Sequence, residues 1–140
     1  RHPKSQEQDM ASNFGEWITK SQEGVEMLSP QEAQAALTAD PNTMVLDVRD
    51  ASDLSLTGTI ADTVNVSMGT LFFKADESMP EQFRDPNLAD KDRTIITTCT
   101  LGLVACIAAK TLQDYGYTNV KVLEGGNAAW RDAGLPLDEA

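Results

Sequence analysis

The amino-acid sequence predicts a single α/β domain in which a mostly parallel sheet carries helices on both faces. The chain has 140 residues, enough to enclose one core, and 41% of them are hydrophobic. Short apolar or β-branched runs at Met44 to Val48, Val64 to Val66, Thr94 to Thr98 and Val120 to Leu123 are typical of buried strands. Segments with helical signals separate these runs, and this alternation indicates βαβ units and a parallel sheet.

The N-terminal segment differs in character from the rest of the chain. Residues 1–25 are polar and show little sustained periodicity, so we expect a flexible arm there and a folded domain over residues 26–140. Phe14, Trp17 and Ile18 are the exception. They predict a short helix that packs on the domain.

A capping box marks the first helix of the domain. Ser29 is the N-cap, Pro30 takes the first helical position and Glu32 supplies the returning carboxylate. We expect this helix to run to about Ala39, where Asp40-Pro41 stops it.

Three further helical segments are expected. A brief helix should cover residues 51–56, and helical pieces joined by loop should cover residues 68–86. Gly125-Gly126 opens a final helix that contains Trp130 and ends before Pro136.

The central segment, Arg93 to Leu112, combines a strand, a tight loop and a helix. Cys99 stands at the carboxyl end of the strand, where ligands bind in open parallel sheets. Backbone N–H groups of the loop and first helical turn can converge on an anion, and would stabilise a thiolate there. A buried structural cysteine is the other interpretation. The helix places its apolar residues on one face: Val104, Ile107, Ala108, Leu112 and Tyr115.

Charge and hydropathy exclude several classes of function. The net charge is −11, from 22 acidic and 11 basic residues. This balance argues against nucleic acid and anionic membranes as partners, since both require basic patches. No apolar stretch is long enough to span a membrane or to form the core of a signal peptide. We interpret the acidic surface as a source of solubility.

The reactive residue types are few. Two cysteines, Cys99 and Cys106, are too few for a disulfide framework, and His2 is the only histidine. The chain therefore has no Cys/His dyad, no Ser/His/Asp triad and no cluster spaced for zinc. Any cysteine chemistry must proceed without a histidine base, and we expect a reducing, cytoplasmic setting.

A series of short motifs gives the chain a family resemblance through their order and spacing. They are Val45 to Asp50, Gly58 to Ile60 before Val64 to Val66, Cys99 to Leu103 before Ala108 to Leu112, Gly116-Tyr117, Leu123 to Trp130, and Ala133 to Pro136. Together they resemble the rhodanese-homology domain, from about Glu26 to Leu137.

The resemblance implies a five-stranded parallel α/β domain that moves sulfane sulfur without a cofactor or metal. The loop cysteine, here Cys99, attacks a donor such as thiosulfate or a persulfide and holds the sulfur as a persulfide. It then passes the sulfur to cyanide, a thiol or a protein acceptor. The backbone N–H groups expected to cradle the persulfide anion are those of Thr100, Leu101, Gly102, Leu103, Val104 and Ala105.

The loop departs from the family pattern in its side chains. Val104 and Ala105 occupy positions where the family commonly has arginine and a hydroxyl residue, and Leu101 and Leu103 are apolar. Thiosulfate is a dianion, and a charge-assisted hydrogen bond contributes about 1.5–3 kcal/mol. We therefore predict weak thiosulfate turnover. An apolar rim better suits a persulfide on another protein or on a low-molecular-weight thiol.

Two departures bear on other functions. Ala61-Asp62-Thr63 stands where the family usually has Pro-Gly-Ala, which affects specificity rather than fold. A phosphatase needs an arginine close after the cysteine, but Val104 and Ile107 occupy the fifth and eighth positions after Cys99. The alternative to a sulfurtransferase is a catalytically weak rhodanese-like module for protein interaction or regulation, which the loss of polar loop chemistry favours. Cys99 and Gly102 argue against that alternative.

Several other residues could be functional or structural. Cys106 could resolve an oxidised Cys99 as a disulfide, although a small packing residue is the commoner role. Asp47 and Arg49 are expected to form a structural ion pair or to bind loop ends. Trp130 and Gly125-Gly126 are expected to determine the fold rather than to contact ligand.

Four residues are candidates for the surroundings of the site. Arg93 and Lys74 are the cations that we place near the mouth of the pocket. Phe72 and Phe73 could wall the pocket, but core packing is the expected role for both.

Overall fold

Five strands form one parallel sheet in the order β1-β5-β4-β2-β3. This arrangement is seen in a computed structural model, which describes residues 11–140. The parallel α/β sheet predicted from the sequence is thereby confirmed. The strands are β1 (Glu26–Leu28), β2 (Met44–Asp47), β3 (Val64–Asn65), β4 (Ile95–Thr98) and β5 (Val120–Leu123).

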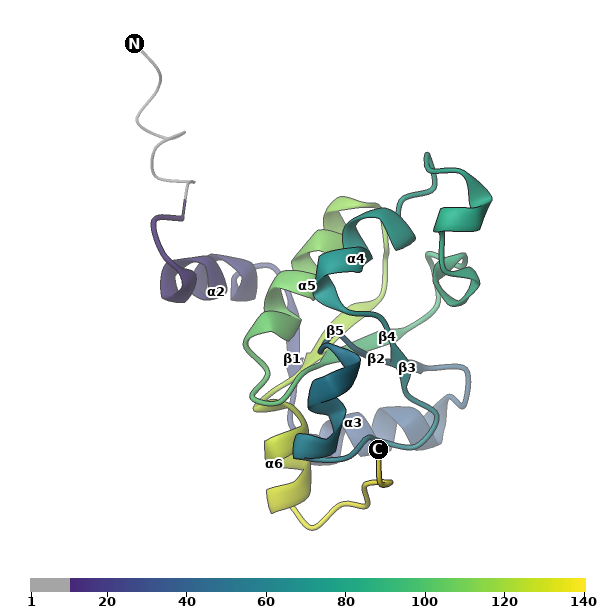
Figure 1. Cartoon of the computed structure of the whole chain (residues 1–140). Helices are drawn as coiled ribbons and strands as arrows, with labels where there is room; N and C mark the ends of the chain where they lie inside the picture. Colours follow the sequence, from purple (N-terminus) through teal and green to yellow (C-terminus); the bar gives the residue numbers. More distant parts are fainter. Residues whose placement is uncertain (1–10) are drawn as a thin grey trace.

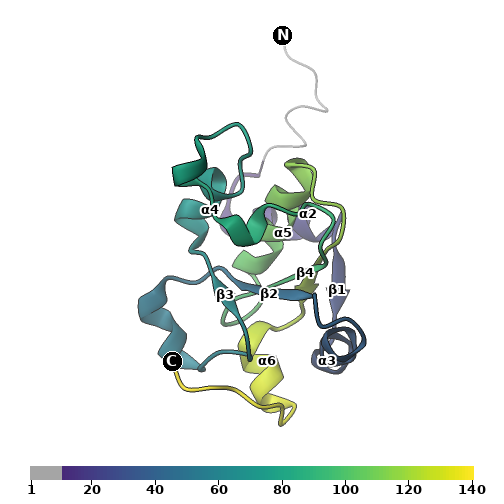
Figure 2. The same cartoon turned by 90° about the vertical axis from the view of Figure 1, so that its right-hand side faces the viewer.

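Helices cover both faces of this sheet, as Figures 1 and 2 show. One face carries α4 (Met68–Lys74) and α5 (Val104–Asp114), and α2 (Phe14–Gln22) packs on α5. The opposite face carries α3 (Pro30–Ala39) and α6 (Gly126–Asp132). Short 3₁₀ helices cover Ala51–Leu56, Glu81–Phe83 and Pro86–Leu88.

The core divides into two layers because successive strand residues point to opposite faces. Met44 and Leu46 of β2 pack with α4 and α5, whereas Val45 between them packs with α3 and α6. Ile95 and Ile96 of β4 divide in the same way. The continuous apolar runs noted in the sequence are therefore strands that are buried on both sides.

Several local predictions are confirmed. The Ser29 hydroxyl accepts from the Glu32 N–H at 3.1 Å, and the Glu32 carboxylate accepts from the Ser29 N–H at 2.9 Å. The resulting helix, α3, ends at Ala39 as expected. Residues 51–56 form the expected short helix, in 3₁₀ geometry.

The N-terminal helix expected around Phe14, Trp17 and Ile18 is present as α2, whose Ile18 and Ser21 are buried. The flexible arm expected over residues 1–25 includes residues 1–10, among them His2, which lie outside the described part of the chain. The division of the chain after residue 25 stays a prediction. Within residues 11–140 no helix combines the length and the apolar character needed to cross a membrane.

The expected apolar face of α5 packs on the core but is not the whole buried surface of the helix. Ile107, Ala108 and Leu112 are buried as predicted, and Val104 and Tyr115 are partly buried against the core. Ala105, Cys106 and Ala109 are also buried, although they lie off the predicted stripe. The burial extends around the helix because α2 and α4 pack on α5 in addition to the sheet.

The capping box of α3 provides a test of stability against pH. Hydrogen bonds from Ser29 lower the pKa of Glu32 below its ordinary value of 4.5. A carboxylate with a lowered pKa stabilises the fold at neutral pH, and this contribution is lost as pH falls through the lowered pKa. We expect Glu32→Ala to be less stable than wild type at pH 7, and the difference to vanish in strongly acidic buffer. Urea denaturation at both pH values measures the difference in the free energy of unfolding between the two proteins. A difference that persists in acid would contradict the stabilising role assigned to the Glu32 carboxylate.

Candidate active site at Cys99

Cys99 lies where β4 ends and a tight loop leads into α5 (Figure 1). Its side chain is 6% exposed, and its Sγ accepts a hydrogen bond from the Gly102 N–H at 3.1 Å. Gly102 has φ +81°, a conformation that turns the chain back toward the sulfur and that residues with a Cβ rarely adopt. The loop thus aims the Gly102 N–H at the thiol, and the N-terminus of α5 adds its dipole.

In the described part of the chain, most of the candidate binding residues have a backbone N–H without a backbone acceptor, although Gly102 and Ala105 do not line the cavity and Ala105 is fully buried. Within residues 11–140 the structure gives no backbone acceptor for the N–H of Thr100, Leu101, Leu103, Val104 or Ala105. Those of Val104 and Ala105 belong to the first helical turn, where N–H groups have no intrahelical partner. Five of the six expected cradle residues therefore keep an unused donor, and the sixth, Gly102, already donates to Cys99.

The start of α6 holds this loop in place. Asn127 N–H donates to the Cys99 carbonyl at 2.8 Å, and Ala128 N–H donates to the Thr100 carbonyl at 3.0 Å. A Cβ placed on Gly126 would lie 2.4 Å from the Cys99 carbonyl oxygen and 2.5 Å from the Gly102 nitrogen. The Gly125-Gly126 pair, expected to determine the fold, also provides the surface on which the reactive loop rests.

Arg49 forms a buried network beside the loop. Its Nη2 lies 2.7 Å from the Asp47 carboxylate, which confirms the expected ion pair. Nη1 donates to the Asp53 carbonyl, the Thr57 hydroxyl and, at 3.4 Å, the Thr100 hydroxyl. Both side chains are almost completely buried. The guanidinium is therefore neutralised by Asp47 and committed to fixed partners.

Cys106 lies in α5 with its side chain fully buried. Its Sγ donates to the Gly102 carbonyl at 3.2 Å, so it supports the reactive loop from inside. Burial raises the pKa of this thiol above its ordinary value of 9.0. A protonated, buried thiol is a poor nucleophile at neutral pH, which favours the packing role for Cys106.

A cavity of about 400 Å³ opens over Cys99. Its walls are mainly apolar, and among residues 11–140 Arg49 is the single basic residue that lines it. Asp50 and Asp53 are the acidic residues of the lining. The lining residues are Phe14, Val48, Arg49, Asp50, Asp53, Met68, Cys99, Thr100, Leu101, Leu103 and Val104.

The two cations expected near the mouth of the pocket are not there. Arg93 lies before β4 and donates to the Asn42 carbonyl at 2.6 Å, so it sits at the amino ends of the strands. Lys74 ends α4 and lines a different cavity. Phe72 and Phe73 do not line the Cys99 cavity either. The expectation for Arg93 and Lys74 is wrong because Arg93 leads into the amino end of β4, opposite the end that carries Cys99, and Lys74 lies at the far end of α4 from Met68, which lines the Cys99 cavity.

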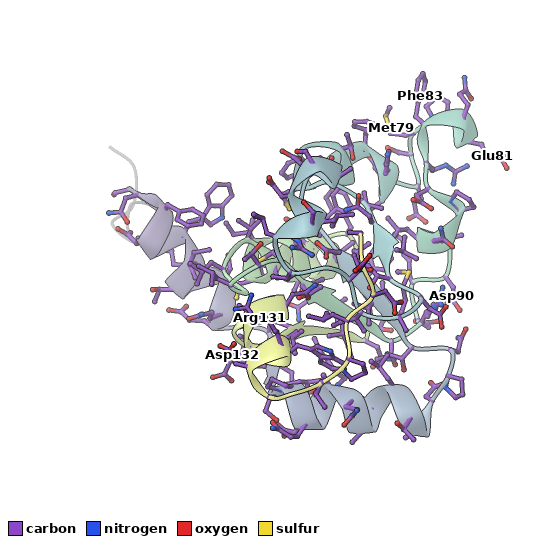
Figure 3. All side chains as sticks on the ribbon, turned by 60° about the horizontal axis from the view of Figure 1, so that its bottom comes forward. Met79, Glu81, Phe83, Asp90, Arg131 and Asp132 are labelled. Atoms are coloured by element: carbon purple, nitrogen blue, oxygen red, sulfur yellow. The ribbon has the colours of Figure 1, made fainter. Side chains whose placement is uncertain are left out.

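That second cavity, of about 320 Å³, lies under the segment between α4 and β4. It is lined by Tyr117, whose hydroxyl donates to the Leu88 carbonyl at 2.6 Å, and burial raises the pKa of Tyr117 to about 12. Glu81 also lines it, and Figure 3 shows Glu81 with Met79 and Phe83 on the side of the molecule away from Arg131 and Asp132 of α6. No cysteine lines this cavity, and the described residues contain no group of three or more side chains that could hold a metal ion.

Six lining residues of the Cys99 cavity were not identified from the sequence as site residues: Phe14, Val48, Arg49, Asp50, Asp53 and Met68. Asp50 and Asp53 follow β2, and a position just after a strand in a parallel sheet was the available signal. Phe14 and Met68 belong to helices whose docking on α5 decides their position, and no local pattern reports it.

Comparison with known proteins places this site in a family. Residues 29–133 match the rhodanese-like domain. The chain is 31% identical over 113 residues to thiosulfate sulfurtransferase GlpE of Actinobacillus succinogenes, covering 81% of this chain and 90% of that protein. It is 30% identical over 105 residues to the adenylyltransferase and sulfurtransferase UBA4 of Candida albicans, covering 75% of this chain but only 23% of that protein.

Solved structures agree on the architecture. A Rhodopseudomonas palustris protein of unknown function, described as a possible tyrosine phosphatase, superposes with a TM-score of 0.83 at 28% identity, over 92% of this chain and 96% of its own. The polysulfide-sulfur transferase homodimer of Wolinella succinogenes has a TM-score of 0.69 at 26% identity, over 91% of this chain and 88% of its own.

Proposed function

The chain belongs to the rhodanese-like domain family, and on that premise we propose that it is a sulfurtransferase that carries sulfane sulfur as a persulfide on Cys99. The observation that carries the proposal is the position of the Cys99 sulfur. It accepts the Gly102 N–H, lies at the N-terminus of α5 and lines the open cavity. A thiolate with those neighbours is stabilised without a histidine.

The proposed reaction has two steps. The Cys99 thiolate attacks the outer sulfur of the donor, a sulfur–sulfur bond forms to Cys99, and the donor leaves as sulfite from thiosulfate or as a thiolate from a persulfide. The terminal sulfur of the Cys99 persulfide is then attacked by cyanide, a thiol or a protein acceptor, and Cys99 leaves as the thiolate. In this proposal the backbone N–H groups of Thr100, Leu101 and Val104, which have no backbone acceptor within residues 11–140, bind the persulfide anion.

The cavity supports a persulfide donor over thiosulfate. Arg49 is the only basic side chain in its lining, and Asp47 already neutralises it. Asp50 and Asp53 add negative charge that opposes a dianion. The name of the Actinobacillus relative assigns thiosulfate to that protein; for this chain we propose weak thiosulfate activity. The dependence on a free thiol leads us to propose a cytoplasmic setting.

The test is the intact mass of the full chain after incubation with glutathione persulfide, and separately with thiosulfate. We expect a gain of one sulfur atom from the persulfide donor and little gain from thiosulfate. Cyanide should remove the added sulfur as thiocyanate. No gain from either donor would overturn the proposal and favour a non-catalytic interaction module.

A positive charge in the loop should restore thiosulfate binding. We expect Val104→Arg to raise kcat/KM for thiosulfate about ten- to hundredfold, because Val104 lines the cavity and a charge-assisted contact contributes about 1.5–3 kcal/mol. Thiocyanate formation from thiosulfate and cyanide measures it. Val104→Gln is the matched control, since it adds polar length without charge. Equal gains in both variants would show that charge is not what the wild-type loop lacks.

A phosphatase function has less support. The Rhodopseudomonas protein is described as a possible tyrosine phosphatase, but in this chain no arginine occurs within eight residues after Cys99. Arg49, the only basic side chain in the cavity lining, is bound to Asp47. A phosphate dianion would therefore meet backbone N–H groups alone, without the bidentate cation that phosphate recognition commonly uses.

A further inference from the structure

We propose that Phe14, from the helix that precedes the domain core, makes this site selective for small sulfur donors that carry an apolar group. The inference rests on the sulfurtransferase function proposed above and assigns the class of its donor: an organic persulfide or thiosulfonate with an alkyl or aryl substituent. Phe14 lies outside residues 29–133, the part of the chain that matches the family. The selectivity is thus assigned to a helix outside the part of the chain that matches the family model.

Helix α2 is held firmly enough to form a wall. Ile18 and Ser21 are buried at 6% and 3% exposure, and α2 packs on α5. The Gln113 side chain, near the end of α5, donates to the Gly24 carbonyl at 2.9 Å, which fixes the link after α2. At the other end, the Asn13 side chain caps the helix by accepting from the Glu16 N–H at 2.9 Å. Phe14 therefore starts a capped and anchored helix.

Phe14 nevertheless leaves half of its surface exposed, at 50%. Phe14 lines the Cys99 cavity together with Leu101 and Leu103, which are 60% and 40% exposed. Three large apolar side chains exposed around one reactive thiol mark a surface that binds an apolar group. The cavity volume, about 400 Å³, suits a small molecule.

The charges of the site point to the same donor class. Asp50 and Asp53 oppose a dianion, and Arg49 has no free N–H to offer because Asp47, Asp53, Thr57, Gly58 and Thr100 accept from it. A donor in this cavity gains affinity from its apolar substituent, while backbone N–H groups suffice for the single negative charge on its sulfur.

The experiment compares two donors that differ only in the apolar group: the methanethiosulfonate and benzenethiosulfonate anions. Each has one negative charge and the same reacting sulfur. The Cys99 thiolate takes the outer sulfur as a persulfide, and methanesulfinate or benzenesulfinate leaves. The assay follows thiocyanate formation with cyanide as the acceptor. The measured quantity is the ratio of kcat/KM for benzenethiosulfonate to kcat/KM for methanethiosulfonate.

We expect wild type to prefer the benzene donor and Phe14→Ala to lower the ratio about three- to tenfold, the range for loss of an aromatic contact. Trp17→Ala is the matched control: Trp17 is on the same helix and 48% exposed, but lines a different cavity with Lys20 and Lys110. The ratio of kcat/KM values measured for Trp17→Ala should stay within twofold of the wild-type ratio.

Three other outcomes are informative and distinct. Sulfur transfer from both donors with a ratio that Phe14→Ala leaves unchanged, or that Trp17→Ala lowers equally, would overturn the role of Phe14 while leaving the sulfurtransferase proposal intact. Absence of transfer from both thiosulfonates in a wild-type protein that glutathione persulfide still loads with sulfur would overturn the donor class, whereas absence of loading from glutathione persulfide as well would overturn the sulfurtransferase proposal itself.

Discussion

Cys99→Ser is expected to lower sulfur transfer by roughly a thousandfold or more, the scale of losses seen when a catalytic nucleophile is removed. A serine hydroxyl fits the same space beside the Gly102 N–H but does not form a stable persulfide. The fold should be unaffected, since the change conserves size at a position with one hydrogen bond to Sγ. Thiocyanate formation and intact mass after incubation with glutathione persulfide both measure the loss.

Cys106→Ser is the matched control for Cys99→Ser. A serine hydroxyl at position 106 can donate to the Gly102 carbonyl as the thiol does at 3.2 Å, so the loop keeps its internal support. We expect sulfur loading to persist in this variant. Comparable losses from the two substitutions would mean that both thiols take part, for example through a disulfide, and would contradict the packing role assigned to Cys106.

Gly126→Ala should have the largest effect on stability. The new Cβ would lie 2.4 Å from the Cys99 carbonyl oxygen and 2.5 Å from the Gly102 nitrogen, and both are backbone atoms that cannot rotate away. Gly126 also has φ +64°, which disfavours any residue with a Cβ. We expect the free energy of unfolding to fall by on the order of 3 kcal/mol and sulfur transfer to be lost in the molecules that remain folded.

Gly134→Ala separates the two causes of that effect. Gly134 has φ +78°, but a Cβ there would meet nothing within 4 Å. It should therefore show only the conformational cost, about 1 kcal/mol. Urea denaturation of both variants gives the difference due to contact with the reactive loop. Equal destabilisation would show that α6 does not hold the Cys99 loop as described.

The sequence was informative about the elements whose signals are local. The capping box of α3 and the apolar runs of β2, β4 and β5 are recognisable without any knowledge of neighbours. Strand β1 (Glu26–Leu28) was not located, because three residues with a gradient from exposed to buried carry no periodic signal. Strand β1 is defined by its pairing with β5, in which Met27 lies opposite Val122, a residue that is distant in the sequence.

The candidate site was likewise predicted from the sequence only where its signals are local. Cys99 and its loop follow from a strand, a glycine and a helix in succession. The walls of the cavity do not, because Phe14, Arg49 and Met68 reach it from three separate segments. Arg49 was interpreted as structural, and its ion pair with Asp47 agrees; its place in the lining of the cavity depends on how the end of β2 lies beside the end of β4.

The position of β1 has a consequence for the order in which the chain acquires its structure. Both N-terminal elements dock on elements made late: β1 pairs with β5, and α2 packs on α5. During synthesis by a ribosome, residues 14–22 must therefore wait until residue 114 has emerged, and residues 26–28 until residue 123, before their partners exist. Contacts of such long sequence separation slow folding. The loop after Cys99 must wait longer still, because the backbone groups that hold it belong to Asn127 and Ala128 at the start of α6.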